Sequence, residues 1–251
     1  MSVMSAGGYR ARLARDGADV AAAQRLRFAA FHAARGLARP DGLDRDAYDT
    51  MCRHVLVEKR ANGALVGCFR LLALVDGSEI HRSYSAQYYD LSPLCDYPGR
   101  MVEVGRFCIR PGCTDPGILR TALAELTRLV DAEGVAMLFG CSSFHGARAE
   151  AHADALAFLA QGYLAPRRWL PRVKAPDVFR FARMLGRRQP DRRKALCAMP
   201  PLLRSYLGLG GWVSDHAVVD RALDTIHVFT GLEIAAIPPA RARLLRADAA
   251  V

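Results

Sequence analysis

Two opposite charges stand inside the otherwise apolar stretch 101–111, and they are the strongest candidates for chemistry in this sequence. The valines, phenylalanine and isoleucine of this stretch favour a β-strand, which Pro111 ends. Glu103 and Arg106 are costly inside such a strand unless they are paired or used. Gly105 between them predicts a β-bulge, which would turn both side chains toward one cleft and free main-chain N–H groups. A salt bridge on an edge strand is the alternative.

Further charged side chains precede this pair in the chain. Arg27 and Phe31 are four residues apart, so they lie on one face of an expected helix. Asp46 and Asp49 stand in an acidic segment rich in turn formers, which we expect to be a solvated loop because it lacks the glycine and terminal glutamate of a calcium loop. Arg70 is a charge near the end of an apolar strand. Structural roles for Arg27 and Phe31, with the arginine at the surface and the phenylalanine in the core, are the alternative to a site.

Other patterns of catalysis or metal binding are weak or missing in the sequence. Cys141 and His145 would need two further ligands to hold zinc, so we expect no metal site. Ser142 lacks the Gly-x-Ser-x-Gly context of an activated nucleophile. Neither a Walker loop nor Gly-x-Gly-x-x-Gly occurs, and the aromatic residues do not interleave with basic ones as a nucleic-acid platform requires. We therefore expect no nucleic-acid partner.

Composition and charge limit the partners and the compartment. The chain has 251 residues, of which 51% are hydrophobic, and a formal net charge of +10. A basic surface suits an acidic partner, either an acidic carrier protein or an anionic membrane. Seven cysteines without Cys-x-x-Cys indicate reduced thiols in a cytoplasmic protein. The N-terminus lacks the apolar core of a signal peptide, and no apolar run approaches the roughly 18 residues that span a bilayer.

The periodicity predicts alternating strands and helices. An Asn62-Gly63 turn predicts a hairpin, and the order strand, helix, strand after residue 101 predicts parallel pairing of those two strands. We expect residues 1–165 to form the core and the basic residues 166–251 to form an extension packed on it, in a single integrated domain. The expected strands are 9–13, 54–58, 65–72, 101–110, 135–141 and 224–229, and the expected helices begin at Asp16 or Asp19 (through Arg35), at Thr114 or Asp115 (to Gly134), at 147 (to 161) and at 202 (to 207).

The order of elements over residues 101–141 resembles the core of the GNAT acyltransferase superfamily. The resemblance implies an α/β (α+β) fold, in which a central mixed, twisted sheet carries helices on both faces. It also implies that the pantetheine arm of an acyl thioester lies beside the bulged strand. Phe107, Cys108, Ile109 and Gly117 are the positions that would then contact the thioester.

Four spacings resemble more narrowly those of the acyl-homoserine-lactone synthases, which take acyl groups from acyl carrier protein. The spacings are Arg27-x-x-x-Phe31, Asp46-x-x-Asp49, Arg70-Leu-Leu and Glu103-x-x-Arg106. Two departures point elsewhere in the superfamily: Leu37 stands where those synthases carry tryptophan, and the chain continues past their usual length.

Longer stretches, spread over nearly the whole chain, resemble the L-ornithine Nα-acyltransferases that begin the synthesis of ornithine lipid, a phosphate-free membrane lipid. They are Tyr89-Asp-Leu-Ser-Pro93, Glu103-Val-Gly-Arg106, Leu138-Phe-Gly-Cys-Ser-Ser-Phe-His-Gly146, Pro201-Leu-Leu-Arg-Ser-Tyr206 and Asp224-Thr-Ile-His-Val-Phe229. This resemblance implies an enzyme that moves a 3-hydroxyacyl chain from acyl carrier protein to the α-amine of L-ornithine. Glu103 and Arg106 would be catalytic, and the implied substrate contacts are Arg27, Phe31, Asp46, Asp49, Arg70, Ser142 and His145.

The donor end also departs from the wider superfamily. Arg110-Pro-Gly-Cys-Thr-Asp-Pro-Gly117 replaces the Arg-x-x-Gly-x-Gly loop that binds the pyrophosphate of coenzyme A. Carrier-bound pantetheine has a single phosphate, so the change agrees with acyl carrier protein as donor and with no separate cofactor. Glu103 is either the base or an anchor for the substrate's ammonium group, and Arg70 and Arg106 either hold a carboxylate or brace their neighbours. The rival functions are a lactone synthase that uses S-adenosylmethionine and a non-catalytic protein on anionic membranes, with residues 179–188 at the surface.

Overall fold

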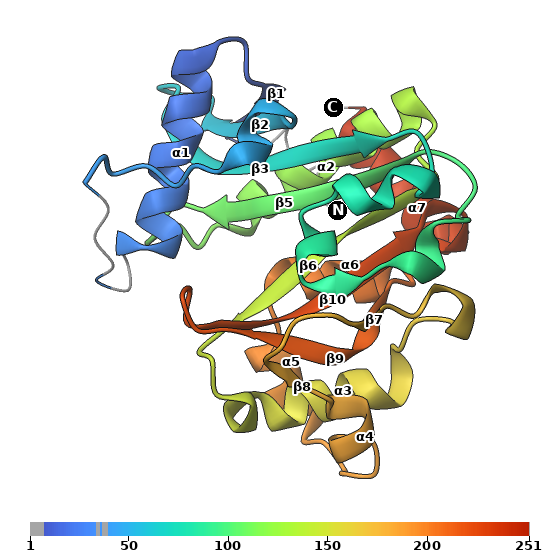
Figure 1. The fold of residues 1–251 in the computed structure, drawn as a ribbon. Helices are drawn as coiled ribbons and strands as arrows, with labels where there is room; N and C mark the ends of the chain where they lie inside the picture. Colours follow the sequence, from blue (N-terminus) through green and yellow to red (C-terminus); the bar gives the residue numbers. More distant parts are fainter. Residues whose placement is uncertain (1–7, 34–35, 37–39, 251) are drawn as a thin grey trace. The chain divides into compact units, whose positions relative to one another are not determined.

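The computed structural model describes residues 8–33, 36 and 40–250, and the chain divides into two compact units (Figure 1). The first unit comprises Met1–Leu72, Val104–Gly134 and Pro239–Val251, and the second comprises Ala73–Glu103 and Val135–Pro238. Strands β3 (Leu65–Leu74) and β5 (Met101–Ile109) each contribute residues to both units. The predicted division at residue 165 into a core and an extension stays a prediction.

The strands of the first unit follow the order β1-β2-β3-β5. Strands β1 (Tyr9–Leu13) and β2 (Arg53–Lys59) are antiparallel, and so are β2 and β3. The main-chain N–H of Lys59 donates to the oxygen of Ala64 at 2.9 Å, and Gly63 takes a φ of 71° that suits glycine. The predicted hairpin is therefore confirmed.

Helices lie on both faces of these strands, as predicted. Neighbouring residues of a strand point to opposite faces. Cys68 of β3 packs in a core cluster with Leu26 of α1 (Gly17–Phe31). A Cβ at the adjacent Gly67 would meet Ile118 of α2 (Pro116–Glu133) at 3.3 Å. The third long helix of this unit, α7 (Pro239–Ala249), packs against α2.

The ends of the helices follow their capping residues. Asp115 caps α2, and Gly134 closes it in the left-handed conformation with a φ of 62°, as predicted. Asp16 caps α1. The prediction that α1 runs through Arg35 is wrong, because the helix ends at Phe31; Arg35 itself lies outside the described residues, as does Leu37.

The strands of the second unit follow the order β5-β6-β10-β9-β8. The predicted parallel pair is confirmed: Met101 to Glu103 of β5 face Met137 to Phe139 of β6 (Met137–His145). The other pairs are antiparallel, and they involve β10 (Thr225–Glu233), β9 (Trp212–Asp220) and β8 (Val178–Phe179). A separate small sheet joins β4 (Tyr89–Asp90) to β7 (Arg172–Val173).

The structure differs from the prediction in strands β6 and β9 and in the helix that follows β6. Strand β6 continues to His145 instead of ending at residue 141, because β10 pairs with it over its full length. Strand β9 was not predicted, since it carries the buried polar residues Ser214 and His216 that mask its apolar pattern. The helix expected from residue 147 begins only at α3 (Ala153–Gly162), after a 3₁₀ turn.

Helices cover one core cluster in the second unit. Leu156 of α3, Phe181 of α4 (Phe181–Leu185) and Leu203 of α6 (Pro201–Gly208) are buried there with Val213 and Val228 of the strands. Helix α5 (Arg192–Ala198) packs on α3. The described part of the chain also contains the connecting 3₁₀ helices η2 (Ala47–Thr50), η3 (Gly77–Arg82), η4 (Ser85–Gln87), η5 (Ser92–Leu94), η6 (Ala149–His152), η7 (Arg167–Trp169) and η8 (Ile234–Ala236). Within residues 8–33, 36 and 40–250, none of the helices has the length and apolarity to cross a bilayer.

We expect Leu156→Ala to lower the free energy of unfolding of the second unit by about 2–5 kcal/mol, because it leaves a cavity at a fully buried position. Met184→Ala is the control, with an expected change below about 0.5 kcal/mol, since that side chain is exposed. Trp169 and Trp212, the two tryptophans of the chain, both lie in this unit, so urea unfolding followed by tryptophan fluorescence measures it. Equal stability of both variants would contradict this description of the core.

Candidate active site

An ion network of three arginines and three aspartates is buried in the first unit. Its members are Arg27, Asp44, Asp46, Asp49, Arg70 and Arg106. With three charges of each sign, the network as a whole is formally neutral. The prediction of a solvated loop around Asp46 and Asp49 is wrong, because this loop lies against the arginines.

Arg27 is the most buried member, with 1% of its side chain exposed. Its guanidinium donates to both carboxylate oxygens of Asp49, at 2.8 and 2.9 Å, in the bidentate arrangement that arginine favours. Its Nε donates to Asp44 at 2.9 Å, and Nη2 also donates to the main-chain oxygen of Asp44. His32 lies 3.2 Å from the other carboxylate oxygen of Asp44.

A capping box fixes the loop locally. The Asp46 side chain accepts the main-chain N–H of Tyr48 at 2.9 Å, and the Asp49 side chain accepts the N–H of Asp46 at 3.4 Å. The reciprocal bonds hold the 3₁₀ helix η2. They also leave both carboxylates directed at the arginines.

Arg70 and Arg106 join the loop to two strands. Arg70 of β3 donates to Asp46 at 2.6 and 3.0 Å and to Asp49 at 2.8 Å. Arg106 of β5 donates to Asp46 at 3.1 Å, and its Nε lies 3.3 Å from Asp44. Asp46 and Arg106 are the most exposed members, at 24% and 17%. Both arginines therefore brace the loop, which is one of their two predicted roles.

Arginine charges hold the three carboxylates in their ionised form. Burial by itself would raise the pKa of Asp44, but Arg106 and Arg27 outweigh it, and the pKa is lowered. Burial is likewise outweighed at Asp46 by Arg70, and at Asp49 by Arg27, so that both pKa values fall below their ordinary range.

The irregular backbone of β5 lies at Arg106 and not at Gly105. Arg106 has a φ of 52°, in the left-handed region that few residues other than glycine adopt. A Cβ at Gly105 would only make ordinary contact, 3.5 Å from the side chain of Arg70. The strain is therefore carried by the residue whose guanidinium the network holds.

Glu103 is held in the second unit by the main chain. The Tyr84 N–H donates to Oε2 at 2.7 Å, and the Ser85 N–H and hydroxyl donate to Oε1 at 2.7 and 2.5 Å. The Ser85 hydroxyl oxygen also lies 3.4 Å from the sulfur of Cys141. Glu103 is 4% exposed. Three donors stabilise it as a carboxylate.

The remaining predicted residues fall into both units. Ser142 and His145 stand on β6 of the second unit, where the Thr230 hydroxyl donates to Ser142 at 2.9 Å. Phe31 packs beside the cluster that buries Cys108, whose sulfur is 3.6 Å from that of Cys68. The Cys108 side chain is therefore part of this core.

The residues predicted at the donor end contact other parts of the first unit. Phe107 stacks on Phe69 with centroids 5.5 Å apart, and Ile109 is the last residue of β5. The N–H of Gly117, at the start of α2, donates to the side chain of Asp115 at 2.8 Å. A carboxylate of the chain thus accepts the N–H group of Gly117, which the sequence predicted to contact the thioester. Contact of these residues with pantetheine, and a shared cleft for Glu103 and Arg106, stay predictions.

Three participants were missed from the sequence. Asp44 was taken for a loop residue, and its partner Arg27 is 17 positions away, so no periodicity connects them. Tyr84 and Ser85 act on Glu103 mainly through main-chain N–H groups, which leave no trace in residue type. The turn-forming serines of residues 83–85 were the only signal.

Comparison with known proteins gives consistent matches. The acetyltransferase (GNAT) domain family matches residues 26–122. The chain is 35% identical to L-ornithine N(alpha)-acyltransferase of Rhodobacter capsulatus over 230 residues, covering 88% of each chain. It is 33% identical to the protein of the same name from Brucella abortus over 241 residues, covering 91% of this chain and 85% of the relative. The structure of a CoA-dependent acyl-homoserine lactone synthase, BjaI, matches with a TM-score of 0.51 at 14% identity, covering 97% of this chain and 89% of that chain, which shows a shared fold.

We expect the free energy of unfolding to fall as the pH decreases below about 4, where unfolded aspartates take up protons. The lowered pKa values of Asp44, Asp46 and Asp49 mean that the folded chain resists this uptake, so their stabilisation is present above that pH and is lost below it. Asp49→Asn should lower the free energy of unfolding at neutral pH by about 3 kcal/mol. It should also make that free energy fall less steeply as the pH decreases below about 4.

Urea unfolding from neutral to acid pH, followed by far-ultraviolet circular dichroism, measures both effects. Asp177→Asn is the control, since Asp177 is a half-exposed carboxylate whose ion pair with Arg221 is worth at most about 1 kcal/mol. A free energy of unfolding that fell with decreasing pH as steeply in both variants as in the unaltered chain would show that the ion network is not the acid-sensitive element.

Proposed function

This chain belongs to the L-ornithine N(alpha)-acyltransferase family, and on that premise we propose that it moves a 3-hydroxyacyl chain from acyl carrier protein to the α-amine of L-ornithine. The product is lyso-ornithine lipid. Family membership along nearly the full length of the chain is the observation that carries this proposal. The buried carboxylate of Glu103 supports it, because the substrate has ammonium groups to be held.

The reaction forms one bond and breaks another. The α-amine attacks the thioester carbonyl, a C–N bond forms, and the C–S bond breaks to release the carrier's thiol. The α-ammonium group must first lose a proton, and the departing sulfur gains one. The protein thus has to hold the ammonium group, accept its proton and stabilise the oxyanion.

The contacts of Glu103 favour the anchor among its two predicted roles. Both carboxylate oxygens of Glu103 accept hydrogen bonds. Two of these bonds come from main-chain N–H groups, whose positions the backbone fixes. Such bonds stabilise the charged form and make the carboxylate a weaker base. We propose that Glu103 holds the ammonium group by charge and that water relays the proton.

Two observations support acyl carrier protein as the donor. The net charge of +10 complements an acidic carrier protein. The stretch 110–117 lacks the loop that would bind the pyrophosphate of coenzyme A. We propose no further cofactor, and we propose that the product reaches the bilayer through peripheral contact with an anionic membrane.

Incubation of the purified protein with 3-hydroxyacyl carrier protein and a panel of amino acids tests the substrates together. Mass spectrometry should find acylated L-ornithine, with the acyl group on the α-nitrogen, and no transfer from the matching acyl-coenzyme A at comparable rates. A diffusible acyl lactone formed only with S-adenosylmethionine would instead identify a lactone synthase.

Glu103→Gln should reduce kcat/KM for ornithine by at least about 100-fold, since it removes the charge proposed to face the ammonium group. Glu150→Gln is the matched control, because Glu150 is an exposed carboxylate of the same unit. If Glu103 is the anchor, the loss appears largely in the KM for ornithine; if it is the base, the loss appears in kcat. A kcat/KM close to that of the unaltered enzyme would remove Glu103 from the site.

Arg106→Ala should also abolish transfer, because it deletes the guanidinium that Asp44 and Asp46 hold. Alanine and arginine share the same left-handed backbone cost at this position, so the variant isolates the side chain. Circular dichroism should show a folded protein. Arg25→Ala, at an exposed arginine of α1, is the control that keeps activity.

A further inference from the structure

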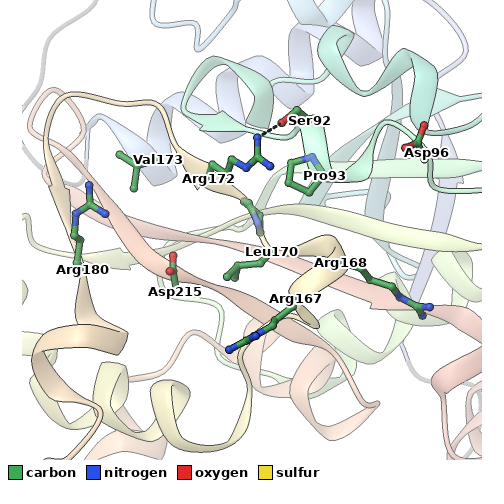
Figure 2. A pocket seen from close by; sticks show the side chains of 11 residues that line it. Ser92, Pro93, Asp96, Arg167, Arg168, Leu170, Arg172, Val173, Arg180 and Asp215 are labelled. Carbon is green, nitrogen blue, oxygen red and sulfur yellow. Dashed lines mark hydrogen bonds between the residues drawn. The ribbon is translucent and has the colours of Figure 1, made fainter.

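An arginine-lined pocket of about 840 Å³ opens on the second unit (Figure 2). Four arginines and two aspartates supply its charges: Arg167, Arg168, Arg172, Arg180, Asp96 and Asp215. We call it the arginine pocket. Its volume is within the range of small-molecule sites. It shares no residue with the ion network or with the contacts of Glu103.

Packing and main-chain pairing hold the walls of the arginine pocket. Arg172 lies on β7, opposite Asp90 of β4, and its guanidinium donates to the hydroxyl of Ser92 at 3.4 Å (Figure 2). The ring of Trp169 packs edge-on against Tyr97 with centroids 5.1 Å apart, and the Arg168 guanidinium stacks over Trp169 at 4.9 Å. Contacts with neighbouring residues therefore hold Arg168 and Arg172 in place.

Three of the four arginines of the arginine pocket lack the close carboxylates that neutralise the ion network. Among the residues that the structure describes, no carboxylate forms an ion pair with Arg167, Arg172 or Arg180, whereas Arg168 lies 4.0 Å from Glu233. Asp215 is already bound to His216, 2.7 Å from its Nδ1. A guanidinium group can donate two parallel hydrogen bonds to the oxygens of one phosphate. A concave surface with several arginines therefore suits a phosphate group.

An exposed apolar side chain follows the pocket in the chain. Arg180 precedes α4, and the N–H of Met184 donates to its main-chain oxygen at 3.0 Å, so Met184 is one helical turn away. The Met184 side chain is 65% exposed, with exposed Arg183 before it and exposed Arg187 after it. Basic side chains around an exposed apolar one are typical of a surface that lies on a membrane.

We propose that the arginine pocket binds the phosphate of an anionic phospholipid headgroup and that α4 rests on the bilayer beside it. The phosphate accepts from the arginines, and hydroxyl groups of a glycerol headgroup donate to Asp96 or Asp215. An acidic carrier protein is the less favoured occupant, because the exposed Met184, one helical turn from Arg180, suits a bilayer. The site goes beyond acyl transfer and does not depend on it.

Vesicle flotation of the full chain tests the site. The vesicles contain phosphatidylcholine with phosphatidylglycerol, or phosphatidylcholine with an equally charged sulfonate lipid that lacks phosphate. We expect Arg172→Gln combined with Arg180→Gln to weaken binding to phosphatidylglycerol vesicles by at least about tenfold. The matched control is Arg148→Gln combined with Arg204→Gln, which removes the same charge from exposed positions outside the pocket and should cost less than about threefold.

The outcomes separate the possible ligands. Equal losses in the two double variants would overturn the pocket in favour of general charge, and so would equal binding to the sulfonate vesicles. Unchanged flotation together with lost affinity for acyl carrier protein would assign the pocket to the carrier. Met184→Ser should weaken flotation but leave the binding of soluble glycerol phosphate unchanged. Acyl transfer with soluble substrates should keep its rate in the pocket variants, so a failure here is distinct from a failure of the enzymatic proposal.

Discussion

The burial of Arg27 is the constraint on which the first unit depends. A guanidinium carries a charge and five N–H donors, and placing it inside a protein is costly unless carboxylates and oxygens surround it. Asp44 and Asp49 meet this demand, so the chain between α1 and β2 has to return across the helix that carries Arg27. The same turn presents Asp46 to Arg70 and Arg106, which joins β3 and β5 to the loop. One buried charge thus determines the course of a whole loop.

Local signals predicted the elements whose ends are set by their own residues. The cap Asp115 and the left-handed Gly134 bound α2, and Asn62-Gly63 gives the hairpin, because each acts on atoms a few positions away. The loop around Asp46 was misjudged for the opposite reason. Acidic turn formers look solvated in a sequence, and their arginine partner Arg70 is 24 residues away. Strand β9 was missed because Ser214 is buried by a tertiary contact: its hydroxyl accepts the main-chain N–H of Phe229 in β10 at 3.1 Å.

Glu103 and Arg106 were singled out together, yet they are fixed by different means. Two main-chain N–H groups and the Ser85 hydroxyl hold Glu103, so its position depends mainly on how residues 83–88 fold. Side-chain carboxylates hold Arg106, and those bonds offset part of the cost of its left-handed backbone. Spacing in the sequence identified both residues as unusual. It contained no information about which partners each would find.

Some arginines of this chain are paired with aspartates in the ion network, and others, in the part that the structure describes, are exposed without a carboxylate partner. The second group carries the excess positive charge. In the ion network each arginine has an aspartate partner, so these three contribute nothing to the net charge of +10. The excess therefore resides on surfaces such as the arginine pocket, where Arg172 has a hydroxyl for a partner instead of a carboxylate. A net charge read from the sequence indicates an acidic partner but not its place. The distances between guanidinium groups and carboxylates locate the binding surface, because only guanidinium groups without a carboxylate partner keep the electric field that attracts an anion.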